Sequence, residues 1–307
     1  MYLQLFLQLF VDWRFLLLLF VILNYVVRPI LNKKIADRGS RTRSLVGVYV
    51  ASFVFAILAW AVFTPVGDVP SLGILAIGTG LGILNGIANY CNWRAVAISQ
   101  SGTALTTQLD DLITLGLGYA LLGETRYLSW PLGVGIVLSL GSAFLLSVYK
   151  SAEGGRDAVP FRRLLGWVLA YSCIWGVEVF AYRCYSMNRV NAFAFLLCIY
   201  GGSLIAAFGV RRVMGSVEAG DPLTGRERRN VAMLAAMNVV AAILLYRMSG
   251  FAPITYTQPT LQASELVFPA LIGLRLFRER NQFTTWPSRL LFVSAFVGGL
   301  ICAFAGS

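Results

Sequence analysis

The chain has 307 residues, of which 58% are hydrophobic and 13% are charged, and its mean hydropathy is +0.73. These values exclude an ordinary soluble globular protein and predict an all-α polytopic membrane protein. The net charge of +11 lies mainly in short polar stretches between apolar segments, so membrane topology explains it better than nucleic-acid binding. The chain has no histidine, and its five cysteines lack a metal-ligand spacing. We therefore expect no metal site and no cofactor.

Ten apolar segments approach the roughly 20 residues that a membrane-spanning helix needs. In chain order they are 13–32, 44–64, 71–93, 102–122, 130–149, 163–185, 191–213, 230–248, 253–275 and 286–305. A polar stretch at 150–162 divides them into two five-helix units, 1–150 and 151–307, within one membrane domain. Because an odd number of helices turns the second unit upside down, we predict a 5+5 inverted-topology repeat.

A duplicated segment agrees with this division. Residues 110–131 recur as residues 265–287, with Asp110 falling on Glu265 at an offset of about 155 residues. An intramembrane acid in both halves predicts a path for a substrate or an ion.

A second acid pair, Glu124 and Glu279, also recurs within the duplicated segment. Each of the two residues lies at a predicted helix end, just before the Trp-Pro that opens the next helix. We expect these acids to be structural, either capping the turn or pairing with Arg126 or Arg280.

Polar residues share one face of each of two helices, at positions i, i+4, i+7 and i+11. In segment 102–122 they are Thr103, Thr107, Asp110 and Thr114. In segment 253–275 they are Gln258, Gln262, Glu265 and Pro269. We expect these two polar faces to line a central cavity, and the alternative is hydrogen bonding between helices without a substrate.

Buried carboxyl groups are candidates for proton coupling because a nonpolar interior disfavours the ionised form. Asp110 and Glu265 are the predicted pair. Asp111 adjoins Asp110, and the sequence leaves open which of these two neighbours titrates.

Further candidate site residues lie in other segments. Asn85, Asn89 and Asn92 share a helix face in segment 71–93, and Asn238 matches Asn85 in the second half. These amides either bind substrate or join neighbouring helices.

Glu178, in segment 163–185, has Asn24 as its counterpart in the first half. It either takes part in transport or pairs with Arg183. Deep aromatic residues either form a cage for a cation or belong to the core; they are Tyr25, Trp175, Tyr182, Tyr200 and Tyr256.

Lysine and arginine residues are concentrated in the loops after odd-numbered helices. The positive-inside rule then places those loops in the cytoplasm and both termini outside. A bacterial or archaeal inner membrane is the favoured location, and an organelle membrane is the alternative. No nucleophile elbow, HExxH, P-loop or dinucleotide fingerprint is found in context, so we expect no enzyme activity.

Two motifs that recur across the ten predicted helices resemble a known family. The first copy reads Gln108-Leu109-Asp110-Asp111 and then Leu122-Gly123-Glu124; the second reads Leu261-Gln262-Ala263-Ser264-Glu265 and then Phe277-Arg278-Glu279. Over nearly its whole length, the chain resembles the ten-helix branch of the drug/metabolite transporter superfamily (EamA-like). Arg278 departs from the usual glycine, and the predicted outside termini depart from the cytoplasmic termini of well-known members.

The resemblance implies a 5+5 inverted repeat and alternating access by rocking helix bundles. It also implies a central cavity lined chiefly by the first, third, fourth, sixth, eighth and ninth helices. Family members move amino acids, amines, sugars, nucleotide sugars, triose phosphates and drugs.

We therefore expect a secondary transporter of a small organic metabolite that acts as a monomer or homodimer in the lipid bilayer. The sequence predicts no lysine deep in a helix and places Arg28 near the basic face. This disfavours phosphorylated anions and favours a cationic or zwitterionic amine or amino acid, or a neutral solute moved with protons. The alternative function is a lipid-headgroup flippase accessory or a lipid-modifying membrane enzyme, with polar residues clustered at one interface.

Overall fold

The computed structural model describes residues 12–37, 41–64, 71–107, 109–142, 144–146, 148, 161–215, 222–278 and 285–305. Throughout these ranges every regular element is a helix. Seven helices are long and apolar enough to cross a membrane: Trp13–Ala36, Arg41–Phe63, Leu72–Ile98, Arg163–Met187, Ala192–Met214, Gly225–Phe251 and Trp286–Ala305. The described part of the chain is therefore all-α, and its long apolar helices indicate a multi-pass integral membrane protein, as the composition predicts.

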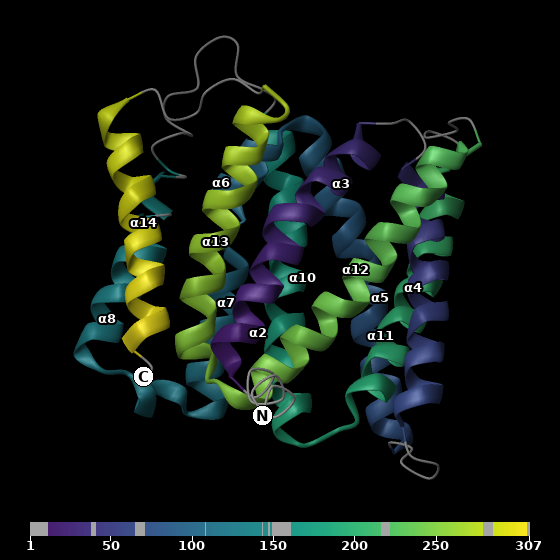
Figure 1. Ribbon diagram of the computed structural model, residues 1–307, viewed down its shortest axis with the longest axis horizontal. Helices are drawn as coiled ribbons and strands as arrows, with labels where there is room; N and C mark the ends of the chain where they lie inside the picture. Colours follow the sequence, from purple (N-terminus) through teal and green to yellow (C-terminus); the bar gives the residue numbers. More distant parts are fainter. Residues whose placement is uncertain are drawn as a thin grey trace, which may run out of the picture.

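The helices form one bundle (Figure 1). The first half contains α2 (Trp13–Val21), the π-helix η1 (Ile22–Val27), α3 (Arg28–Ala36), α4 (Arg41–Phe63), α5 (Leu72–Ile98), α6 (Gln100–Thr106), α7 (Leu109–Leu122), the 3-10 helix η2 (Glu124–Tyr127), α8 (Trp130–Ile136) and the π-helix η3 (Val137–Gly141). The second half contains α10 (Phe161–Met187), α11 (Ala192–Met214), α12 (Gly225–Phe251), α13 (Ile254–Arg275) and α14 (Trp286–Ala305). Predicted segment 102–122 is thus described as two helices, which meet near Thr107.

The first span changes its geometry where it carries polar residues. A π-helix, η1, lies between α2 and α3, and Pro29 follows in the first turn of α3. Proline has no N–H to donate to the carbonyl four residues before it, which loosens the helix there. Wide π turns of this kind are frequent at functional sites.

Small residues bring α5 and α11 close together. Gly78, Gly82 and Gly86 recur every four residues on α5, and an added Cβ at Gly82 would stand 2.2 Å from the carbonyl oxygen of Ile199 on α11. The Ser203 hydroxyl donates to the Gly82 carbonyl at 2.8 Å. Close backbone approach and interhelical hydrogen bonds drive helix association in membranes, so this pair forms a rigid wall of the bundle.

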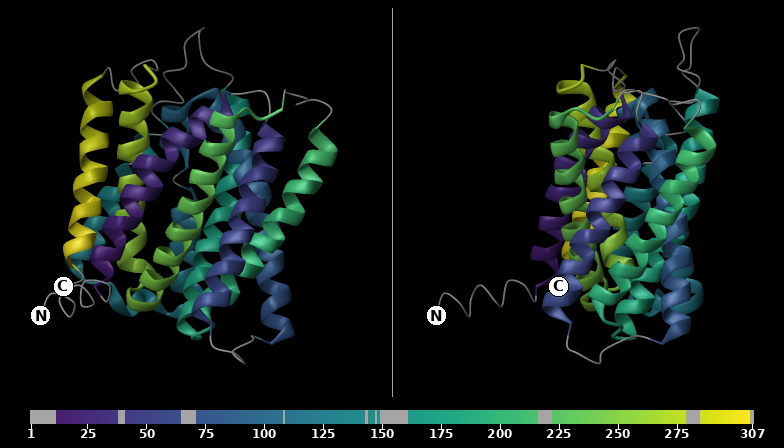
Figure 2. Two further views of the ribbon diagram at one scale, coloured as in Figure 1. Left: turned by 45° about the vertical axis from the view of Figure 1, so that its right-hand side comes forward. Right: turned by 90° about the vertical axis from the view of Figure 1, so that its right-hand side faces the viewer.

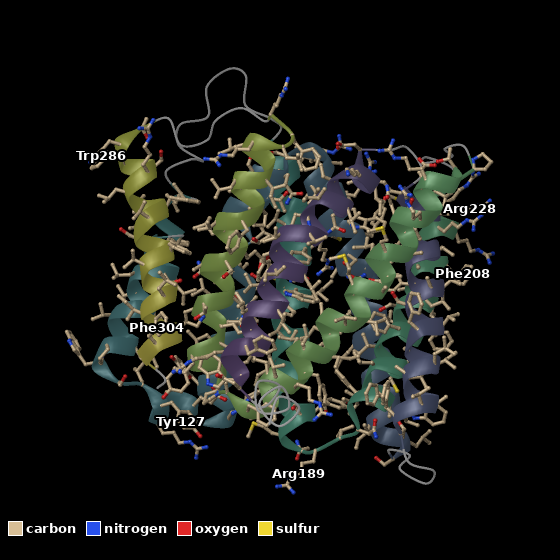
Figure 3. The ribbon with its side chains drawn as sticks, in the orientation of Figure 1. Tyr127, Arg189, Phe208, Arg228, Trp286 and Phe304 are labelled. Carbon is tan, nitrogen blue, oxygen red and sulfur yellow. The ribbon has the colours of Figure 1, made fainter. Side chains whose placement is uncertain are left out.

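The long helices run between two opposite ends of the bundle, as the turned views also show (Figure 2). Trp286 and Arg228 lie at one end, whereas Tyr127 and Arg189 lie at the other (Figure 3). The first span begins at the end that holds Tyr127, and α14 finishes there (Figure 1).

Glu124 has a different partner from the one predicted. It is 2% exposed, and its Oε1 forms an ion pair with Arg183 Nε at 3.0 Å. Its Oε2 accepts the backbone N–H of Thr255 at 3.2 Å, which caps the start of α13. Arg126 instead stacks over Tyr127 and donates to its hydroxyl at 3.0 Å. The predicted pairing with Arg126 was therefore wrong, because the partner lies far away in sequence.

Arg183 is 6% exposed and ties α10 to the turn after α7. The second-half counterparts, Glu279 and Arg280, lie outside the described residues.

Candidate functional site

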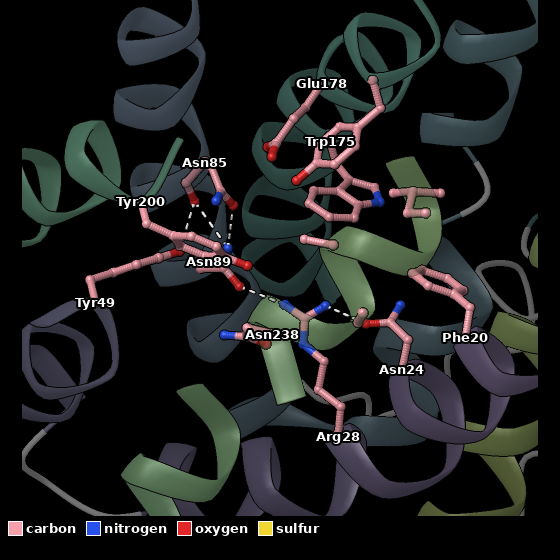
Figure 4. A pocket seen from close by; sticks show the side chains of 14 residues that line it. Phe20, Asn24, Arg28, Tyr49, Asn85, Asn89, Trp175, Glu178, Tyr200 and Asn238 are labelled. Atoms are coloured by element: carbon pink, nitrogen blue, oxygen red, sulfur yellow. Dashed lines mark hydrogen bonds between the residues drawn. The ribbon is translucent and has the colours of Figure 1, made fainter. Parts of the chain in front are cut away.

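A small cavity of about 30 Å³ lies among the first span, α4, α5, α10, α11 and α12. We call it the central cavity (Figure 4). Its polar and aromatic lining includes Asn24, Arg28, Tyr49, Asn85, Asn89, Trp175, Glu178, Tyr182, Tyr200 and Asn238. The volume has room for about two water molecules, so a larger solute requires the helices to separate.

Arg28 supplies a fixed positive charge inside the bundle. One of its terminal nitrogens donates to Asn24 Oδ1 at 2.7 Å, and the other donates to Asn89 Oδ1 at 2.8 Å. The third nitrogen, Nε, is buried without a hydrogen-bond partner. The sequence placed Arg28 near the basic face, and the structure directs its guanidinium into the central cavity. The spacing of Asn24 and Arg28, one turn apart, was the available signal.

This placement supplies a fixed positive charge, whose absence was the reason for disfavouring phosphorylated anions. A guanidinium needs no lysine beside it to hold a carboxylate. The central cavity can therefore bind an acidic group as well as a basic one.

The predicted asparagines Asn85 and Asn89 line the central cavity, and Asn85 also joins α5 to α11. Asn89 Nδ2 donates to Asn85 Oδ1 at 2.6 Å, and Asn85 Nδ2 donates to Ser203 Oγ on α11 at 3.1 Å. This chain holds Arg28 in place while it also lines the cavity. Asn238, on α12, has a buried Oδ1 without a hydrogen-bond partner.

Glu178 faces Arg28 from the far side of the central cavity (Figure 4). It is 1% exposed, and neither carboxylate oxygen has a hydrogen-bond partner. The alternative pairing with Arg183 is excluded, because that arginine binds Glu124. A buried carboxylate without partners costs several kcal/mol, so this position favours a ligand or a proton.

A second cavity, of about 40 Å³, adjoins the first and shares Asn24 and Arg28 with it. Glu265 contributes a carboxylate to its wall and has Tyr25 and Thr107 as hydrogen-bond partners. The other polar lining residues are Asn32, Asn92, Gln100, Thr103 and Tyr171. Arg28 therefore stands between two polar cavities.

The two predicted polar faces are only partly directed at a cavity. Thr103, Thr107, Glu265 and Pro269 line the second cavity. Asp110, Thr114, Gln258 and Gln262 line neither of the two.

The residues outside the cavities join helices to one another. Gln258 Nε2 donates to Asp111 Oδ1, and Gln262 Oε1 accepts from Ser139 Oγ at 2.5 Å. Thr114 donates to the Gly176 carbonyl at 2.9 Å.

Asp110 lies in the first turn of α7 and is 1% exposed. Its Oδ1 accepts the backbone N–H of Asp111 at 3.0 Å, while Oδ2 is buried without a partner. A carboxylate at this position is stabilised by the helix N-terminus. Asp110 therefore sits beside the cavities but does not line them.

The predicted deep aromatic residues do not all line the same cavity. Trp175, Tyr182 and Tyr200 line the central cavity, and Tyr25 lines the second cavity. Tyr256 lies elsewhere and donates to the Tyr127 carbonyl at 3.4 Å.

Residues from both halves of the sequence line the central cavity. With offsets of about 151 to 155 residues, twelve of its lining residues form six pairs. The pairs are Phe20 with Trp175, Asn24 with Glu178, Arg28 with Tyr182, Tyr49 with Tyr200, Asn85 with Asn238, and Asn89 with Ala242.

The π-helix accounts for a change in the offset between paired residues, which is 155 at Phe20 and 154 at Asn24 and Arg28. Phe20, Asn24 and Arg28 are spaced by four residues each, whereas their counterparts on α10 are spaced by three and four. A π turn holds one residue more than an α turn. The additional residue in η1 therefore keeps Arg28 on the cavity face.

No family model matches the chain, and no curated protein matches it either. Among solved structures, a crystal structure described only as that of a protein is similar over 93% of this chain and 93% of its own. Its TM-score is 0.65, at 14% sequence identity. At that identity the likeness shows a shared fold alone.

Proposed function

We propose that this protein is a secondary transporter of a small organic metabolite, working by alternating access through the central cavity. The observation that carries the proposal is Glu178, a buried carboxylate without hydrogen-bond partners, in a cavity lined by matching residues of both halves. Intramembrane ionisable groups of this kind mark substrate or ion pathways.

The proposed architecture is ten spanning helices in a 5+5 inverted repeat, as in drug/metabolite transporters. The six matched pairs support it, since an inverted repeat brings equivalent residues together at its pseudo-two-fold axis. Reciprocal contacts support it too: Ser203 donates to the Gly82 carbonyl, and Ser52 donates to the Ala235 carbonyl at 3.4 Å.

The position of the repeated Trp-Pro turns also favours inversion. Tyr127, just before Trp130, lies at one end of the bundle, and Trp286 lies at the other (Figure 3). Both tryptophans are exposed, as expected for anchors at the two membrane interfaces.

The favoured substrates are amines and amino acids, cationic or zwitterionic, because a carboxylate and aromatic rings meet in the central cavity. Asp110 and Glu265 remain the candidates for proton coupling. Of these two residues, Glu265 lines the second cavity, which shares Arg28 with the central cavity.

Uptake by proteoliposomes tests the proposal. A panel of radiolabelled amino acids and amines should include at least one solute that the purified protein moves. Glu178→Gln should lower that uptake at least tenfold, because the amide carries no charge. Glu227→Gln is the matched control: Glu227 is partly exposed at the start of α12, does not line the central cavity, and glutamine can keep its capping box with Thr224.

Uptake of every panel solute at the rate of protein-free liposomes would contradict the transporter proposal. Stabilisation by lipid headgroups alone in a thermal-shift screen would favour the flippase-accessory or lipid-enzyme alternative. The double variant Asp110→Asn with Glu265→Gln should abolish uptake while keeping a monodisperse, folded protein; full uptake would contradict the assignment of these acids.

A further inference from the structure

We infer that the central cavity selects zwitterionic solutes in one orientation, with the ammonium group at Glu178 and the acidic group at Arg28. This inference rests on the proposed function, because it takes the central cavity as the substrate site. It narrows the substrate from amines in general to molecules that carry both charges.

The first argument is the asymmetry between matched positions. Glu178 stands where the first half has Asn24, and Arg28 stands where the second half has Tyr182. The pairs formed by Tyr49 and by Asn85 hold like residues and are neutral. Each half thus contributes one charge to the cavity lining, and the two charges have opposite signs. A cavity of this kind is polarised and suits a dipolar ligand.

The second argument is that both charges have unused hydrogen-bonding capacity. Both oxygens of Glu178 and the Oδ1 of Asn238 are buried acceptors without partners, and Arg28 Nε is a buried donor without one. An ammonium group carries three donors and a carboxylate carries only acceptors. One zwitterion can therefore supply hydrogen-bond partners to Glu178, Asn238 and Arg28.

The third argument is that Glu178 does not use Arg28 as its own partner. Its carboxylate oxygens have no hydrogen bond to the guanidinium, which is held by Asn24 and Asn89 instead. In a low-dielectric interior, opposite charges attract strongly. Holding them apart across a cavity leaves a place for a molecule that bridges them.

Solutes with one charge fit less well. An amine without an acid would pair with Glu178 but would bring a second positive charge toward Arg28. An acid without an amine would meet the negative charge of Glu178. Trp175 and Tyr200 in the wall can pack against the apolar part of any of these solutes.

Binding to the purified full-length protein tests the inference directly. Isothermal titration is run with each common L-amino acid, with its decarboxylated amine and with its desamino acid. The best amino acid should bind at least about tenfold more tightly than both of its analogues, since a charge-assisted hydrogen bond is worth about 1.5–3 kcal/mol. Equal affinity of the amine or of the acid, or no binding by any amino acid, would overturn the inference.

Charge variants locate the two ends of the ligand. Arg28→Gln should remove the preference for the amino acid over the amine, while Arg28→Lys should retain part of it. Arg163→Gln, an exposed arginine at the start of α10, is the control and should leave the preference unchanged. An undiminished preference in folded Arg28→Gln protein would overturn the orientation. The wild-type comparison stands by itself if that variant fails to fold.

Parallel uptake measurements separate this inference from the proposed function. If an amine binds and crosses the membrane as well as its amino acid, the transporter proposal stands and the zwitterion inference fails. If an amino acid binds selectively but never crosses, the zwitterion inference stands and the transporter proposal fails.

Discussion

The close contact of α5 with α11 leaves no room for a larger side chain at Gly82. In Gly82→Ala the new Cβ would lie 2.2 Å from the Ile199 carbonyl oxygen, whereas ordinary contacts begin near 3.4 Å. The two helices must therefore separate by about 1 Å, since both contacting groups are on rigid helices.

Separation of α5 from α11 has an estimable cost. Overpacking of this kind costs about 1–3 kcal/mol, and stretching the bond from Ser203 to the Gly82 carbonyl costs about 1 kcal/mol. The better helix propensity of alanine returns about 1 kcal/mol. We expect a net loss of about 1–3 kcal/mol, which lowers Tm by about 2–5 °C for a chain of this size.

Thermal unfolding in detergent, followed by tryptophan fluorescence, measures the effect. Gly80→Ala is the control on the same helix, because a Cβ there meets nothing within 4 Å. It should leave Tm unchanged or raise it slightly. If Gly82→Ala is as stable as Gly80→Ala, the close approach of α5 and α11 is refuted.

Three further substitutions should change stability in the same assay. Glu124→Gln should cost about 3–5 kcal/mol by leaving the Arg183 charge buried without its partner; Arg126→Gln should be nearly neutral, and equal losses would contradict the pairing. Arg278 has a φ of 52°, so Arg278→Gly should stabilise the protein by about 1 kcal/mol, and a lower Tm would argue against this backbone conformation. Asn191 accepts two N–H groups at the start of α11, so Asn191→Ala should cost about 1 kcal/mol; an unchanged Tm would contradict the cap.

The positions of the helices were largely predictable from sequence, because lipid demands long apolar segments with internally satisfied backbones. Polar faces were harder to assign. Gln258 and Glu265 follow the same periodicity on α13, yet the first binds Asp111 and the second lines a cavity. Periodicity fixes the direction of a side chain around its helix, but the neighbouring helix decides what it meets.

Charged partners were the least predictable feature. Arg183 lies five residues after Glu178 yet pairs with Glu124, which is distant in sequence. Arg28 is followed by Pro29 and two lysines, a pattern typical of a helix end near the membrane surface. The depth of a residue in the bundle depends on the position of the whole span, and the proline and lysines after Arg28 do not carry that information.

The wide turn of η1 makes the first span unusually tolerant of a change in length. Losing one residue within Ile22–Val27 would restore regular α-helix and still leave Phe20 and Arg28 on the same face. The same loss in the middle of α10 would rotate every later side chain by about 100° and take Tyr182 out of the cavity wall. Insertions and deletions of one residue between related chains should therefore be concentrated at this turn. There they change the spacing of the polar groups but leave these groups on the same face of the helix.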